Sequence, residues 1–148
     1  MDDHIRASEE LFSAAKSELK HLVPLYFHNC PYERFWKSNR RRAEQQTPTW
    51  DILRTYGPDW RVVFVGDASM SPYEIVEPGG SVEHWNEEAG KIWLQRITGH
   101  FRRVAWLNPT PMKHWGYTTS IGLMQDAMDG RMFPMTLEGL DDMAKALR

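Results

Sequence analysis

Two short apolar runs without polar alternation dominate the hydropathy pattern of the chain. Residues 61–66 and residues 103–107 are rich in β-forming side chains, and a polar turn follows each run. Runs of this kind are typical of strands buried on both faces, as in a parallel sheet covered by helices. Two further stretches, residues 21–28 and 132–135, predict additional strands, of which the first lies at an edge because it contains Pro24.

Helical patterns separate these strands. The predicted helices cover residues 2–20, 49–56, 86–100 and 118–128, a short helix starts at Pro72, and a closing helix follows Thr136. Thr49 and Thr136 are the expected N-caps of their helices. The closing helix is expected to turn four apolar side chains inward, those of Leu137, Leu140, Met143 and Leu147.

This alternation of strands and helices predicts an α/β fold, a doubly wound and mostly parallel sheet with helices on both faces. The length of 148 residues predicts one domain over residues 1–148. Residues 29–46 are polar and are interpreted as a connection. A net charge of −2 gives no general attraction to nucleic acid or to an anionic membrane. The single cysteine, Cys30, and the absence of an 18-residue apolar span predict a cytoplasmic protein.

The candidate chemistry begins where the first buried run ends. The turn after residues 61–66 carries Asp67, Ser69 and Ser71. Ligands of parallel α/β sheets bind beyond the carboxyl ends of the strands, and one carboxylate with two hydroxyls suits Mg²⁺ or Mn²⁺. A structural interpretation stands beside this one, in which Asp67 hydrogen-bonds the turn and Ser71, followed by Pro72, caps a helix.

Other chemistry-bearing residues have weaker patterns. The six histidines show no metal-ligand spacing, and Cys30 has no evident base near it in sequence. The basic run 40–42, with Arg34 and Lys37 nearby, suits a phosphate or an acidic partner surface, or is simply a solvated face. Trp93 and Trp106 are interpreted as packing residues. Four others are left open between packing and an interface: Trp36, Trp50, Trp85 and Trp115.

Three segments carry a family resemblance. Val104-Ala105-Trp106-Leu107-Asn108-Pro109, then His114-Trp115-Gly116-Tyr117, then Leu137-Glu138-Gly139-Leu140 resemble the carboxyl-terminal part of von Willebrand factor A domains of the CoxE-like type. Residues 27–30 and 62–71 are similar to the second and fourth strands of that family. The resemblance extends over essentially the whole chain.

The resemblance implies a metal-ion-dependent adhesion site. By its order along the chain, Asp67 resembles the aspartate that follows the fourth strand of the family. Thr47 or Thr49 resembles the threonine ligand, and Ser69 and Ser71 are second contributors. The intact domain holds Mg²⁺ or Mn²⁺.

The opening strand of the family and its metal motif would precede residues 2–20, so an amino-terminally truncated domain, or an incorrectly assigned start, is expected. Loss of that strand leaves strand edges unpaired, which predicts a homodimer or a strand-swapped assembly.

The function that the resemblance implies is a non-enzymatic protein-interaction module. It would work with a MoxR-type AAA+ ATPase in the assembly or activation of other proteins. The alternative is a metal-dependent hydrolase that uses Asp67 with His28 or His84. A third interpretation is a structural remnant in which Asp67 has no binding role.

Overall fold

A three-stranded parallel sheet forms the centre of the protein. The structure, a computed structural model, describes residues 21–28, 30–38, 40, 42–78 and 88–148. The strands β3 (Arg61–Val65), β4 (Arg103–Asn108) and β5 (Met132–Pro134) lie in the order β3-β4-β5. The predicted parallel α/β architecture and these three strands are confirmed.

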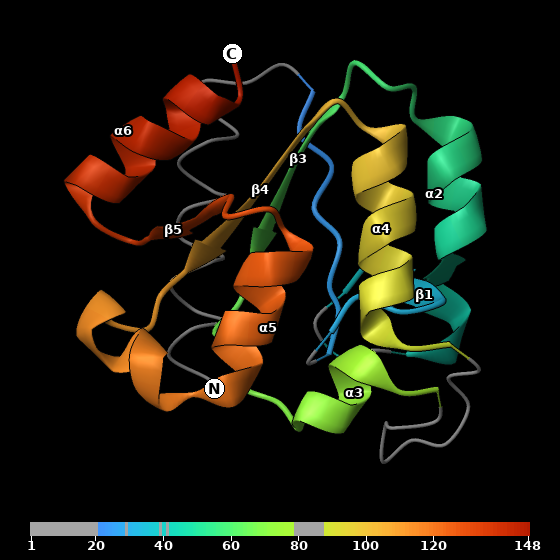
Figure 1. The fold of residues 1–148 in the computed structure, drawn as a ribbon. Helices are drawn as coiled ribbons and strands as arrows, with labels where there is room; N and C mark the ends of the chain where they lie inside the picture. The colour runs from blue at the N-terminus through green and yellow to red at the C-terminus, as the bar shows by residue number, and fades with distance from the viewer. Residues whose placement is uncertain (1–20, 29, 39, 41, 79–87) are drawn as a thin grey trace.

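Helices flank this sheet (Figure 1). Between β3 and β4 the chain forms α3 (Pro72–Val76) and α4 (Gly90–His100). Between β4 and β5 it forms a 3₁₀ helix, η2 (Met112–Tyr117), and α5 (Thr119–Ala127). The last helix, α6 (Leu137–Ala146), packs along β4 and β5, while α4 and α5 contact one another. The part of the chain that the structure describes contains no helix long and apolar enough to cross a membrane.

The core lies between β3, β4 and the helices α4 and α5. Phe64 of β3 is in register with Trp106 of β4, and the two rings lie 5.2 Å apart. Phe27, from the segment before β1, contacts both rings edge-on at 6.0 and 5.7 Å. Trp93 of α4 is buried in the same cluster, so Trp93 and Trp106 are packing residues, as predicted. Each such buried side chain contributes roughly 1.5–3 kcal/mol through removal of apolar surface from water.

The two long apolar runs are buried to different extents. The central strand β4 is buried from Val104 to Asn108, as the pattern predicts. In β3 only Phe64 is buried, and its neighbours are half-buried or exposed. The reason is position, because β3 lies at an edge of the sheet among the described residues. The predicted dimer or strand swap at such an edge stays a prediction.

Residues 21–28 do not form the predicted strand. Within them Tyr26 makes one isolated bridge to Trp36, with N···O distances of 2.7 and 2.9 Å. The polar segment interpreted as a connection instead contains an antiparallel pair, β1 (Arg34–Trp36) and β2 (Gln46–Pro48), with a short 3₁₀ turn, η1 (Ala43–Gln45). Burial of Phe35 and Trp36 explains this hairpin inside a polar stretch.

Thr49 is not an N-cap. The helix α2 (Thr49–Thr55) begins at Thr49 itself, after Pro48. The hydroxyl of Thr49 donates to the carbonyl of Tyr32 at 2.5 Å, and the side chain is fully buried. Its hydroxyl therefore joins α2 to the segment before β1.

The closing helix follows the prediction except at its first residue. Thr136 caps α6 by accepting from the Gly139 N–H at 3.0 Å. Gly139 is required, since a Cβ there would lie 2.0 Å from the carbonyl oxygen of Pro134. The prediction that Leu137 faces inward is wrong, since this first residue of α6 is 89% exposed, while Leu140, Met143 and Leu147 are half-buried. The predicted helix over 2–20, together with His84 and Trp85, lies outside the described residues.

Candidate functional site

The turn after β3 is held by side chains from two neighbouring elements. Three consecutive carbonyls, those of residues 66, 67 and 68, each accept one side-chain hydrogen bond. The bonds are Trp106 Nε1 to Gly66 O at 2.8 Å, Asn108 Nδ2 to Asp67 O at 3.0 Å, and Ser120 Oγ to Ala68 O at 2.7 Å. Two donors come from β4 and the third from α5, so the sheet and a helix fix this turn together.

The turn needs this support. Ala68 has φ 56°, in the left-handed region that a residue with a Cβ adopts at a cost on the order of 1 kcal/mol. Asn108 is fully buried, and its Oδ1 also accepts from the Thr110 N–H at 2.9 Å. A single asparagine at the end of β4 thereby ties the turn after β3 to the turn after its own strand.

Asp67 and Ser71 both take the structural roles that the sequence offered. Asp67 Oδ1 accepts from the Ser69 N–H at 3.0 Å, which closes the turn. Ser71 caps α3 by accepting from the Tyr73 N–H at 3.3 Å. The second carboxylate oxygen of Asp67 has no hydrogen-bond partner among the described residues. Within the described part of the chain, Asp67 therefore uses only one of its two carboxylate oxygens to hold the turn.

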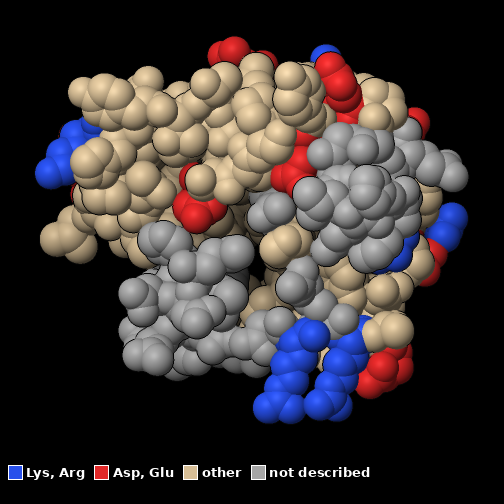
Figure 2. Space-filling model, turned by 90° about the horizontal axis from the view of Figure 1, so that it is seen from below, with Lys and Arg blue, Asp and Glu red and all other residues tan. Residues whose placement is uncertain are grey.

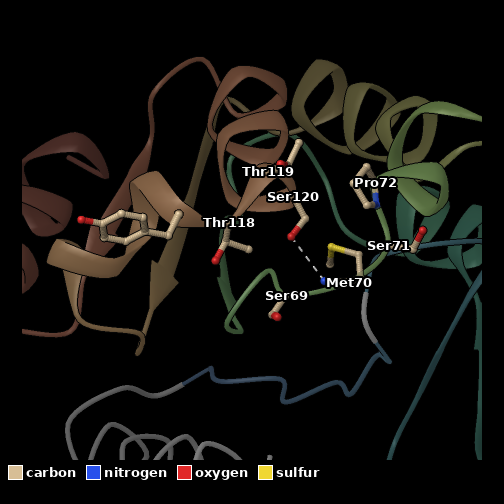
Figure 3. Close-up of a pocket in the computed structure, with 8 residues that line it drawn as sticks. Ser69, Met70, Ser71, Pro72, Thr118, Thr119 and Ser120 are labelled. Carbon is tan, nitrogen blue, oxygen red and sulfur yellow. Dashed lines mark hydrogen bonds between the residues drawn. The ribbon is translucent and has the colours of Figure 1, made fainter.

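A depression of about 460 Å³ opens beside this turn. It is lined by the loop between β3 and α3 and by the start of α5 (Figure 3). Six of its eight lining residues carry hydroxyls, and the lining comprises Ser69, Met70, Ser71, Pro72, Tyr117, Thr118, Thr119 and Ser120. Ser120 Oγ joins the two walls, since it also accepts from the Met70 N–H at 3.4 Å. The cavity is therefore a polar one with neutral oxygen donors.

The structure gathers only part of the predicted ligand set. Ser69 and Ser71 line the depression, whereas Asp67 precedes them in the same loop and is not one of the lining residues. Thr47 and Thr49 do not line it, since Thr47 pairs with Phe35 in the hairpin and Thr49 donates to Tyr32. Among the residues that are described, no group of three or more His, Cys, Asp or Glu side chains is placed to hold a metal.

Sequence reasoning missed the second wall of the cavity. Thr118, Thr119 and Ser120 belong to a run of hydroxyl residues that opens α5, after the strand next to β3. Adjacent parallel strands end at the same edge of a sheet, so this run could have been placed beside Asp67. The sequence obscures this neighbourhood, because η2 separates β4 from the hydroxyl run at the start of α5.

The remaining chemical candidates lie away from this cavity. None of the described histidines lines it, and His84 lies outside the described residues. Cys30 is buried against Gly90, where a Cβ would lie 2.3 Å from its Sγ. Burial, and next the charge of Glu74, raise the pKa of the Cys30 thiol far above its usual range. This thiol is a packing group and is unsuited to attack a substrate.

No protein-family model matches the chain, and neither does any curated protein or solved structure. Its function therefore has to be inferred from the residues of this site.

Proposed function

We propose that this protein is a non-enzymatic protein-binding module of the von Willebrand factor A type, close to the CoxE-like members. In this proposal a carboxylate of the partner binds at the turn after β3. The observation that carries it is the fixed turn, in which three side chains donate to the backbone carbonyls of residues 66–68 and Asp67 uses only Oδ1 of its carboxylate to accept from the Ser69 N–H. A binding site gains affinity from such preorganisation, because little ordering remains to be done when the partner arrives.

The donor set suits a weakly held magnesium ion. Mg²⁺ takes oxygen ligands, often one or two carboxylates, and keeps several of its waters. Asp67 would hold the ion directly, and the hydroxyls of Ser69 and Ser71 would face it. Thr118 and Thr119 line the cavity with Ser69 and Ser71 and replace Thr47 and Thr49 as hydroxyl contributors in this proposal. The bound ion would supply a positive charge with open positions for the partner's carboxylate.

The surroundings of the cavity favour a protein partner. Tyr117 is 88% exposed at its rim, and Tyr73, next to the lining residue Pro72, is 61% exposed. Exposed aromatic side chains beside a polar anchor point are typical of protein interfaces. Figure 2, which views the molecule from below, shows that the described residues in the upper part of this face are mostly uncharged, with a few acidic side chains among them. A MoxR-type AAA+ ATPase is the partner class that the family resemblance suggests.

Magnesium binding is the first test. Asp67→Asn keeps an oxygen that accepts from the Ser69 N–H, so the turn should persist while the charge is lost. In the wild type, Mg²⁺ should shift the amide NMR signals of residues 66–71 and 117–122, with a dissociation constant on the order of 1 mM. Asp126→Asn, an exposed carboxylate of α5, is the matched control and should bind as the wild type does. Equal Mg²⁺ affinity in Asp67→Asn would refute the metal role.

Partner binding is the second test. A purified MoxR-type ATPase from the same organism is immobilised, and association is followed by biolayer interferometry. Asp67→Asn should weaken association by about tenfold or more, and Asp126→Asn should not. An ATPase that binds both variants as tightly as the wild type would remove Asp67 from the interface.

A further inference from the structure

The hairpin formed by β1 and β2 carries a concentration of positive charge at its tip. Four cationic residues fall within residues 37–42, and no Asp or Glu lies between Glu33 and Glu44. The described members are Lys37, Arg40 and Arg42, all exposed and here called the basic tip. The whole chain has a net charge of −2, so without the three positive charges of the basic tip the rest of the chain carries −5. The basic tip is therefore opposite in sign to the remainder of the protein.

Four cations elsewhere in the described chain have acidic partners. The ion pairs are Arg54–Asp51, Arg96–Glu88, Arg102–Asp59 and Lys145–Asp141. Lys37, Arg40 and Arg42 form no ion pair with any described residue. Like charges that lie near one another in the chain repel, and an anionic ligand that binds among them relieves this repulsion.

The basic tip stands on a well-anchored base. Phe35 and Trp36 of β1 are buried, and the Phe35 ring contacts Phe27 at 6.1 Å. The strands continue in register up to Lys37, whose N–H donates to the carbonyl of Gln45 at 2.9 Å. Ser38 Oγ accepts from the Arg40 N–H at 3.1 Å within the tip. Charges presented by a folded hairpin lose less conformational entropy on binding than charges on a loose tail.

We propose that the basic tip docks an acidic segment of a partner protein. A carboxylate-rich peptide matches the cluster in charge, and arginine binds carboxylates in a two-bond geometry. Single-stranded nucleic acid fits less well, because the hairpin's aromatic rings are buried and cannot stack on bases. Backbone pairing on β2 is also disfavoured, since the Gln46 N–H already bonds Ala43 and Pro48 has no N–H. The tip therefore recognises charge through its side chains.

The test uses a fluorescein-labelled peptide of about ten consecutive glutamates and fluorescence anisotropy at low salt. The triple variant Lys37→Gln, Arg40→Gln, Arg42→Gln should bind it about tenfold more weakly than the wild type. The matched control Arg54→Gln, Arg102→Gln, Lys145→Gln removes the same charge from three exposed sites and should change affinity by less than about twofold. Wild-type affinity should fall as salt is raised.

Three outcomes would overturn the proposal. They are no binding by the wild type at low salt, equal weakening in the two triple variants, and tighter binding of an oligothymidine of the same length than of the peptide. The result is independent of the proposed function. Binding to the basic tip should be unchanged in Asp67→Asn and should need no Mg²⁺. Binding at the turn after β3 should require both the Asp67 carboxylate and Mg²⁺.

Discussion

Two tryptophans of this protein are similarly buried, but only one of them forms a hydrogen bond through its indole N–H. Trp106 of β4 is fully buried, and its Nε1 donates to the carbonyl of Gly66 at 2.8 Å. Trp93 of α4 is nearly as buried, yet its Nε1 has no hydrogen-bond partner in the described structure. The Arg96 guanidinium instead lies over the Trp93 ring, 4.5 Å from its centroid.

The two tryptophans belong to different kinds of interaction. Trp106 is part of a buried hydrogen-bond network with Asn108 and Ser120, and Trp93 is part of a partly exposed stack with Arg96 and Trp50. Around Trp106, β4 and α5 donate to three carbonyls of one turn, and every member is buried or half-buried. Around Trp93, Arg96 also covers Trp50, which is 49% exposed, and bonds the Glu88 carboxylate through two nitrogens. Interactions inside the network replace water in a low-dielectric setting, whereas those in the stack compete with water. Removing an interaction of the network should therefore cost more stability than removing one of the stack.

The largest expected effect is at Asn108. Asn108→Ala removes the donor to Asp67 O and the acceptor of the Thr110 N–H, and it leaves a small cavity. We expect a loss of about 3 kcal/mol in the free energy of unfolding, measured by urea denaturation. Gln95→Ala, which removes an exposed amide of α4, is the control and should cost less than about 0.5 kcal/mol. Equal costs would mean that water satisfies the turn without Asn108.

Ser120 should have the next largest effect. Ser120→Ala leaves the carbonyl of Ala68 and the N–H of Met70 without their shared partner. The expected loss is about 1.5 kcal/mol. Thr119→Ala, one residue earlier and exposed at the cavity, should be nearly neutral in the same denaturation experiment. A neutral Ser120→Ala would show that α5 does not hold the turn.

The two tryptophans can be compared directly. Trp106→Phe and Trp93→Phe remove the same atoms, but only Trp106→Phe breaks an indole hydrogen bond. Trp106→Phe should therefore cost about 1 kcal/mol more than Trp93→Phe. Thermal and urea unfolding of the pair measure this difference. A larger cost at Trp93 would reverse the ranking of network and stack.

These residues also mark what the sequence determines. Burial of Trp93 and Trp106 follows from apolar runs and helical spacing, which fix the faces of strands and helices. The fate of each indole N–H depends on long-range neighbours, such as Gly66 for Trp106, 40 residues away. The same limit explains the site. The sequence predicts the Asp67 turn because its motif is local. It does not predict the contact of Ser120, which lies 52 residues after Ala68 in the chain.

The β1–β2 hairpin shows a second limit. Its two strands have three residues each, too short for a period-two pattern to stand out from the polar segment around them. Phe35 packs against the ring of Phe27, and Trp36 pairs with Tyr26. These contacts between separate segments are not visible in the local sequence. For β3, the apolar run correctly predicts a strand. It wrongly predicts burial on both faces, because the composition of a strand does not reveal that it lies at the edge of the sheet.

The smallest expected effect concerns acid sensitivity of the stack around Trp93. The hydrogen bond from Arg96 lowers the pKa of the Glu88 carboxyl in the folded protein. The pair therefore stabilises the fold above the ordinary carboxyl pKa of the unfolded chain. This contribution disappears as the pH falls through the lowered pKa of the folded state. Glu88→Gln should lower Tm slightly at neutral pH, and the gap to the wild type should close in acid and at high salt.

Glu77→Gln, at another exposed carboxylate, is the control for the loss of charge and should show no such closing gap. A gap for Glu88→Gln that stays constant from neutral to acid pH would mean that Glu88 acts through packing of its side chain. In that case Arg96 would be held over Trp93 and Trp50 by the rings alone, and the stack would resemble the network in its indifference to pH.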